Sequence, residues 1–258
     1  MDTFLHPGVT YGPVRSRRLG LSLGVNLLPA DGKICTFDCI YCECGFNAER
    51  KTSSRHPGRD EVARALESKL AQMAAEGTPP DVITFAGNGE PTTHPHFPGI
   101  IADTTGLRDK YCPGAKVAVL TNGSAIHKER IREALMAVDD NIVKLDTVSP
   151  AYVGLVDRPV PAYDLQRAVE AMEAFRGHII IQTMFMAGTY LGRSVDNTGE
   201  EYVAPWLETV KRIAPQSVMV YTIDRATPAG GLLKATPGQL DGICRRVRAE
   251  GIPCTASY

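Results

Sequence analysis

Residues 21–45 read LSLGVNLLPADGKICTFDCIYCECG, and two features of this stretch decide the fold. Its first part, Leu21–Leu28, has the length and apolar composition of a buried β-strand. Its second part, Lys33–Gly45, comes directly after that strand, ends well before the first helical pattern and contains four of the seven cysteines. We therefore expect a cysteine-rich loop at the end of a buried strand.

Strands and helices alternate along the rest of the chain. Five further apolar, β-branched runs of strand length are Asp81–Ala86, Lys116–Thr121, Ile142–Val148, His178–Met186 and Ser217–Ile223. Apolar residues recur at helical spacing in residues 60–76, 97–110, 127–138, 164–175, 200–213 and 237–250. Strands joined by helices run parallel, and right-handed crossovers wind them into a barrel, a partial barrel or an open sheet. Six units are too few to close an eight-stranded barrel, so the sequence predicts an α/β fold with a partial (β/α)6 parallel barrel.

The chain contains no repeat, low-complexity tract or linker that would divide it. Its 258 residues are a length that an α/β barrel commonly uses for one domain, so we expect residues 1–258 to form a single domain. The stretch Gly188–Gly199, rich in Gly, Ser, Thr and Asn, is expected to be a long loop, either a mobile lid or a surface excursion.

Charge and hydropathy limit the partners of the protein. The 28 basic and 29 acidic residues give a net charge of -1, so the protein has no global field that attracts nucleic acid or an anionic membrane. No apolar run is long enough to span a bilayer, and the first 18 residues lack the apolar stretch of a signal peptide. These features predict a cytoplasmic protein without a membrane partner.

The cysteines are arranged for a metal rather than for disulfides. Their number is odd, and four of them lie between Cys35 and Cys44. Cys35, Cys39 and Cys42 are separated by three and two residues, so one short loop can direct three thiolates at three irons of a cubic cluster and leave the fourth iron open. The alternative is a structural zinc site with Cys44 as fourth ligand, which the spacing disfavours because no second ligand pair follows. Cys112, Cys244 and Cys254 are expected to be small buried side chains.

Polar residues follow the predicted strands at their carboxyl ends, where α/β folds build their sites. The second strand is followed by Gly87-Asn-Gly-Glu-Pro91, in which the glycines allow a ligand to approach the backbone closely. The third strand ends at Asn122, and the fourth carries Lys144 and Asp146 on one face, either at a site or in a surface ion pair. The remaining polar candidates are Gln182 in the fifth strand, Tyr221 at the end of the sixth, and His94 and His96 after the Gly-Glu-Pro turn.

The spacing Cys-x-x-x-Cys-x-x-Cys, with Tyr41 before the last cysteine, resembles the signature of the radical S-adenosylmethionine (radical SAM) superfamily. The resemblance implies a 4Fe-4S cluster on Cys35, Cys39 and Cys42, whose open iron binds S-adenosyl-L-methionine, and it places Tyr41 near the adenine. Residues 87–91 are similar to the family's Gly-Gly-Glu-Pro element, which holds the methionine ammonium. Because Asn88 replaces the first glycine of that element, the implied contacts are assigned to Gly89, Glu90 and Pro91.

The same resemblance extends to the ends of later strands. It implies that Asp146 contacts the ribose or the methionine carboxylate, and that the backbone near Val220 and Tyr221 reads the adenine. Asn122 and Gln182 complete the expected cofactor-binding set.

The resemblance also implies a reaction. Reductive cleavage of S-adenosyl-L-methionine, with electrons from a flavodoxin or ferredoxin, gives a 5'-deoxyadenosyl radical that abstracts hydrogen from a small-molecule or peptide substrate. One alternative is tRNA base modification, because residues 11–19, with Arg15, Arg17 and Arg18, and residues 87–92 together resemble a subgroup related to the wyosine-type tRNA-modifying enzymes. Those arginines either grip an anionic substrate or form a solvated arm. Glycyl-radical activation of a partner enzyme and a non-enzymatic iron-sulfur or zinc module are the remaining alternatives.

Overall fold

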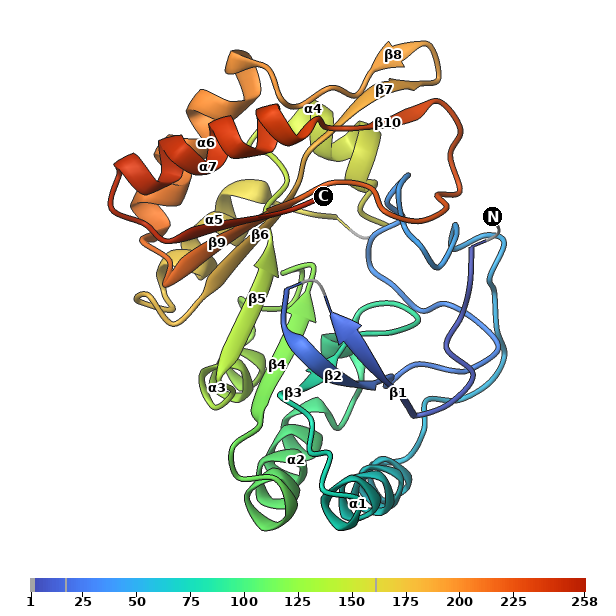
Figure 1. Ribbon diagram of the computed structural model, residues 1–258. Coiled ribbons are helices and arrows are strands. Elements are labelled where there is room, and N and C mark those ends of the chain that lie inside the picture. Colours follow the sequence, from blue (N-terminus) through green and yellow to red (C-terminus); the bar gives the residue numbers. More distant parts are fainter. Residues whose placement is uncertain (1–2, 17, 161) are drawn as a thin grey trace.

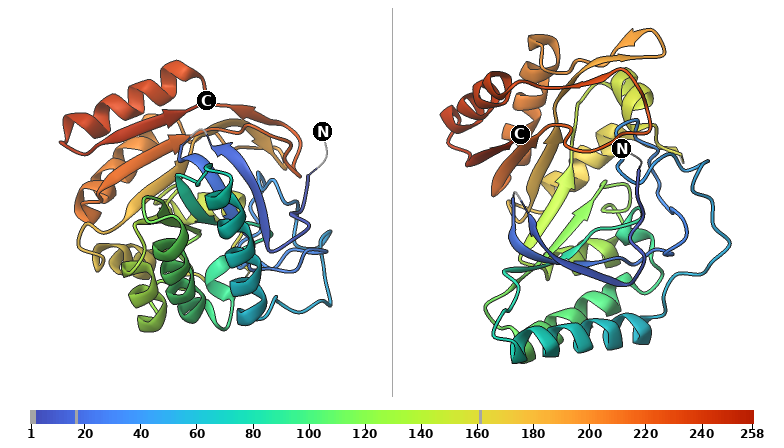
Figure 2. Two further views of the ribbon diagram at one scale, coloured as in Figure 1. Left: turned by 60° about the horizontal axis from the view of Figure 1, so that its bottom comes forward. Right: turned by 45° about the vertical axis from the view of Figure 1, so that its right-hand side comes forward.

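The computed structural model describes residues 3–16, 18–160 and 162–258, and it confirms the α/β partial barrel (Figure 1). All six predicted strands form, and they pair in parallel in the order in which they occur along the chain. They are β2 (Gly20–Val25), β3 (Val82–Phe85), β4 (Lys116–Thr121), β5 (Asp140–Lys144), β6 (Ile180–Met184) and β9 (Ser217–Tyr221). The sheet curls around an interior that faces away from the helices (Figure 2).

Two edge strands extend this sheet beyond the prediction. β1 (Thr10–Ser16) pairs antiparallel with β2, and β11 (Cys254–Ser257) pairs parallel with β9. The first contains Gly-Pro and the second has four residues, so neither has the periodicity of a buried strand. The expected arginine-rich segment is thus largely a strand, in which Arg15 is exposed. Arg17 lies outside the described residues.

The six predicted helices cover the outer face of the sheet (Figures 1 and 2). They are α1 (Arg59–Ala75), α2 (Phe97–Tyr111), α3 (Glu129–Met136), α5 (Leu165–Glu173), α6 (Glu200–Ile213) and α7 (Pro237–Ala249). Each presents an apolar stripe to the sheet; in α1 the stripe is Val62, Leu66, Leu70 and Met73, all of them buried. Burying one such side chain stabilises the fold by about 1.5–3 kcal/mol. The main core therefore lies between helices and sheet, and the inner face of the barrel remains available for a site.

The expectation of a long loop over Gly188–Gly199 is wrong. β7 (Met186–Tyr190) and β8 (Arg193–Ser194) form a hairpin, and β7 also pairs with β10 (Leu232–Lys234) in a small antiparallel sheet. Gly188 permits this pairing, because its φ is +103° and an added Cβ would lie 2.2 Å from the Gly231 carbonyl oxygen. The partner strand is remote in sequence, so local composition cannot reveal it.

The cysteine loop lies in the long connection from β2 to α1, on the same side of the molecule as the amino-terminal segment (Figure 1). Short helical turns follow two other strands: η1 (Pro91–Thr93) after β3, and α4 (Pro150–Tyr152) with η2 (Val153–Asp157) after β5. No helix among the described residues is long and apolar enough to cross a bilayer.

Candidate active site at the mouth of the barrel

The two sequence motifs lie side by side because their backbones pair. The Ile34 N–H donates to the Asn88 carbonyl at 3.0 Å, and the Glu90 N–H donates to the Ile34 carbonyl at 3.0 Å. Gly89 lies between these bonds with a φ of +139°, and a Cβ on it would lie 1.9 Å from the Ile34 oxygen. Glycine is therefore required at position 89, and the cysteine loop is fixed against the Gly-Glu-Pro turn.

Asn88, which departs from the family element, fastens the amino-terminal segment to the same turn. Its side chain is fully buried, its Nδ2 donates to the carbonyls of His6 (3.0 Å) and Pro29 (2.9 Å), and its Oδ1 accepts from the His6 N–H at 2.7 Å. The Asn88 N–H itself donates to Asn26 Oδ1 at 3.0 Å. A glycine cannot make the side-chain bonds, so the substitution adds a structural role that the sequence did not reveal.

Glu90 joins the ends of β3 and β4. Its buried Oε1 accepts from the Thr92 N–H (3.1 Å), the Thr92 hydroxyl (2.6 Å) and the Thr121 hydroxyl (2.6 Å). Its Oε2 accepts from the Asn122 N–H at 2.7 Å. Burial raises the pKa of Glu90, and the four donated bonds oppose that shift. Because Oε2 accepts one bond from the residues that the structure describes, it retains acceptor capacity for a ligand ammonium.

The thiols of Cys35, Cys39 and Cys42 come from one loop and are close enough for their charges to interact. Burial raises the pKa of Cys35 to about 12 and also raises that of Cys39, and both thiols are affected by the charge of Cys42. Cys35 Sγ lies 3.7 Å from Asn122 Nδ2, and Cys39 Sγ lies 4.0 Å from Asp157 Oδ1. The site thus brings the predicted Asn122 to the cysteine loop.

Cys44 lies beside Cys42, and its thiol lowers the pKa of Cys42 to about 6. It is buried, and its Sγ donates to the Gly87 carbonyl at 3.4 Å. Within the described ranges, no three His, Cys, Asp or Glu side chains are grouped closely enough to hold one metal ion. An iron-sulfur cube spreads its ligands over separate irons, and three thiols on one loop whose charges interact fit that donor set.

Lys144 and Asp146 are buried rather than paired on the surface. Lys144 Nζ forms an ion pair with Asp157 Oδ1 at 2.9 Å and contacts Asp146 and the Tyr41 hydroxyl. Tyr41 also donates to Asp146, and Asp146 Oδ1 accepts from the Met184 N–H at 3.0 Å. The side chains of Lys144 and Asp146 are 14% and 1% exposed, which rules out a solvated ion pair at the rim. Asp157, which the sequence did not single out, completes this network.

Beside the network lies a cavity of about 770 Å³. Four residues that the sequence predicts for the site are among those that line it: Tyr41, Cys42, Gln182 and Tyr221. Val220 is fully buried in the core outside the barrel, consistent with a contact through its backbone alone.

The opposite wall of this cavity comes from residues that the sequence did not indicate. His6 stacks on Tyr11 with ring centroids 3.5 Å apart, and Tyr11 lies directly over Gly24. Burial and the charge of Arg225 lower the pKa of His6 to about 4. Phe4, Arg18 and Arg225 also line this space. The sequence signal for this wall was the presence of three aromatic residues before the first predicted strand: Phe4, His6 and Tyr11.

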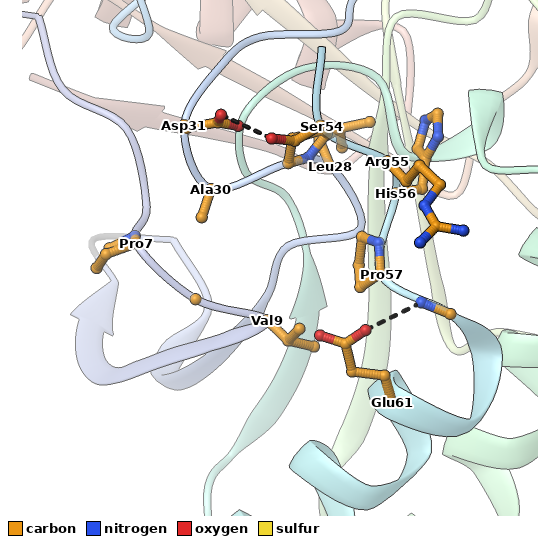
Figure 3. Close-up of a pocket in the computed structure, with 13 residues that line it drawn as sticks. Pro7, Val9, Leu28, Ala30, Asp31, Ser54, Arg55, His56, Pro57 and Glu61 are labelled. Atoms are coloured by element: carbon orange, nitrogen blue, oxygen red, sulfur yellow. Dashed lines mark hydrogen bonds between the residues drawn. The ribbon is translucent and has the colours of Figure 1, made fainter. Parts of the chain in front are cut away.

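His94 and His96 lie away from this cavity. His94 is buried, and its Nε2 lies 2.9 Å from the Pro57 carbonyl oxygen. His56 packs edge-on against the His94 ring and lines a second cavity of about 650 Å³ (Figure 3). There the Ser54 hydroxyl donates to Asp31 at 2.7 Å, and the Gly58 N–H donates to Glu61 at the start of α1. None of the predicted cofactor-binding residues lines this second cavity.

Two of the remaining cysteines meet near the carboxyl terminus. Cys244 in α7 and Cys254 in β11 are buried, as expected, and their sulfurs lie 2.7 Å apart. Cys112 is also buried. These three cysteines do not line the 770 Å³ cavity.

Comparison with known proteins identifies the family of this site. The chain is 30% identical over 218 residues to a protein named GTPase Obg from Brachyspira hyodysenteriae, and 30% identical over 224 residues to a UPF0026 protein from Helicobacter pylori. These matches cover 84% and 85% of this chain but 30% and 68% of the relatives. A radical SAM methyltransferase from Sphaerobacter thermophilus has a similar fold, with a TM-score of 0.67 at 14% identity over 92% of this chain and 66% of that one.

The chain thus spans less than a third of one curated relative and about two thirds of the other. The family model of the radical SAM superfamily matches residues 31–196, which include the cysteine loop, the Gly-Asn-Gly-Glu-Pro turn and the Lys144 network. The chain therefore belongs to the radical SAM superfamily.

Proposed function

We propose that this protein binds a 4Fe-4S cluster through Cys35, Cys39 and Cys42 and cleaves S-adenosyl-L-methionine reductively. The supporting observation is the backbone pairing of the cysteine loop with the Gly-Asn-Gly-Glu-Pro turn, at the carboxyl ends of parallel strands and beside a large cavity. When bound and reduced, the cluster supplies an electron that breaks a sulfonium bond and yields a 5'-deoxyadenosyl radical.

The residues of the chain hold the cofactor in position. The free acceptor capacity of Glu90 Oε2 suits the methionine ammonium, and the missing side chain of Gly89 keeps the backbone accessible. Tyr41 lines the cavity and donates to Asp146, which is buried and not among the lining residues; we assign this pair to the ribose or the methionine carboxylate. Asn122 lies against Cys35. Gln182 in β6 and Tyr221 in β9 line the same cavity.

The substrate that we propose is a small molecule or a peptide residue. The amino-terminal segment supplies a wall of the cavity through Phe4, His6 and Tyr11, and this wall limits access for water to a radical formed inside. Electrons come from a flavodoxin or ferredoxin. A tRNA base and a glycyl-radical enzyme are the competing substrates; tRNA binding that weakens steeply with salt would favour the first of them.

Anaerobic purification tests this proposal. We expect a brown protein with about four iron and four sulfide per chain, which after reduction converts S-adenosyl-L-methionine to 5'-deoxyadenosine. Cys35→Ala should lose the iron and the product, whereas Cys112→Ala, with a buried thiol that does not line the cavity, should keep both. A colourless wild-type protein with one zinc would contradict the proposal.

A further inference from the structure

Lys33 is a buried lysine two residues before the first cluster cysteine. Its side chain is 1% exposed, and its Nζ donates to the Gly45 carbonyl at 2.7 Å, which links the two ends of the cysteine loop. Removing an ammonium from water is costly unless another charge compensates it. The position of Lys33 therefore requires a negative partner inside the protein.

The nearby carboxylates compensate other cations. Asp38 Oδ1 lies 4.0 Å from Lys33 Nζ, but Asp38 also pairs with Arg158 at 3.2 Å and accepts from the Asn47 N–H at 2.7 Å. Asp146 and Asp157 both contact Lys144. Among residues 3–16, 18–160 and 162–258, Asp38 is the only carboxylate within ion-pair distance of Lys33. Their separation of 4.0 Å is the longest at which an ion pair is counted.

The Lys33 ammonium lies inside the cysteine loop, because Lys33 precedes Cys35 by two residues and its Nζ contacts Gly45, three residues after Cys42. Burial lowers the pKa of Lys33, but the nearby charges of Cys42, Cys35 and Cys39 outweigh that effect and raise it. Three thiolates and a cubic cluster carry a net negative charge, and that charge becomes more negative when one electron enters. A fixed cation in a region of low dielectric stabilises the more negative form.

We infer that Lys33 is the counter-charge of the cluster and raises its reduction potential, in addition to bracing the loop through Gly45. This inference rests on the proposed function, because it requires a cluster on Cys35, Cys39 and Cys42. One electron passes from the flavodoxin or ferredoxin to the cluster, and no bond forms or breaks in this step. Lys33 thus acts on the cluster through its charge and is not itself a catalytic residue.

An anaerobic redox titration of the full chain, monitored by electron paramagnetic resonance, tests the inference. Lys33→Gln retains a donor for the Gly45 carbonyl but removes the charge, and Lys33→Met removes both. We expect each to decrease the equilibrium constant for one-electron reduction at least tenfold, which lowers the midpoint potential by about 59 mV or more. Lys33→Arg should keep the potential near that of the wild type.

The control is Lys116→Met, which removes one positive charge from the chain at an exposed position paired with Asp140. Its potential should equal that of the wild type. An unchanged potential in Lys33→Gln and Lys33→Met, with the cluster present, would overturn the inference and leave the proposed function intact. Folded neutral variants that hold no cluster would also overturn it, because Lys33 would then be needed to build the site. A wild-type protein without a cluster would overturn both proposals.

Discussion

Gly89 is the residue at which the cysteine loop and the Gly-Asn-Gly-Glu-Pro turn meet. The Ile34 carbonyl oxygen occupies the space that a Cβ would need, and the positive φ of Gly89 adds strain for any other residue. A single methyl group at this position would separate the two motifs.

Gly89→Ala should therefore reduce the free energy of unfolding by about 1–3 kcal/mol and lower the iron content. Gly106→Ala is the matched control, because Gly106 lies inside α2 and its added Cβ would meet no atom within 4 Å. That change should stabilise the helix by up to about 1 kcal/mol. Urea unfolding and iron analysis check both variants, and a Gly89→Ala protein of normal stability and iron content would contradict the assignment.

Glu90 offers a second test at the scale of a residue. In Glu90→Gln one carboxylate oxygen becomes an amide donor, which leaves either the threonine hydroxyls or the Asn122 N–H without an acceptor. We expect a loss of about 1–3 kcal/mol in the free energy of unfolding at neutral pH. Glu67→Gln, at an exposed position on α1, should change it by less than about 0.5 kcal/mol. Equal stability of the two variants would show that the buried bonds of Glu90 contribute little.

The amino-terminal segment is the element whose position depends most on a few polar contacts. Asn88 holds the backbone of His6, the Phe4 N–H donates to the Glu43 carbonyl, and the Arg50 guanidinium donates to the Thr3 carbonyl. Residues of this element line the cavity, so its order bears directly on how the cavity is enclosed.

Asn88→Gly restores the glycine of the family element and removes the bonds to His6. Hydrogen exchange should increase in residues 3–16, because their backbone loses its main side-chain anchor, while β4 and β5 keep their protection. Mass spectrometry of peptides from both regions measures this difference. Unchanged exchange in residues 3–16 would show that β1 pairing alone orders the segment.

At the scale of the whole molecule, the proposed cluster site and the main core are separate. The large apolar core lies between the helices and the outer face of the sheet, whereas the cysteine loop packs against a smaller cluster that includes Ile40, Tyr152 and Met184. The fold should therefore not depend on the metal, in contrast to a small zinc domain.

Removal of the cluster by oxidation and chelation should increase hydrogen exchange in residues 33–50 and leave β3, β4 and β5 protected. Far-UV circular dichroism of the cluster-free protein should still show the helices and strands of the barrel. Loss of that spectrum on removal of iron would mean that the loop contributes far more to the global fold than its packing indicates.

The sequence determined the features that depend on local spacing. The six parallel strands and six helices follow from periodicities within short windows, and the three cysteines and the glycine-rich turn follow from their spacing and from their place after a strand. Parallel strands bring their carboxyl ends to one edge, which is why the sequence predicts Asn122, Asp146 and Gln182 as site residues.

The tertiary structure alone decided the contacts between residues that are distant in the chain. The hairpin of β7 and β8 exists because β10 pairs with it, Asn88 acts through His6, and Lys144 is buried because Asp157 compensates its charge. Lys33 likewise gains its partners only when the loop closes on Gly45. Such contacts join residues that are far apart in the chain, so spacing and periodicity within a short window do not indicate them.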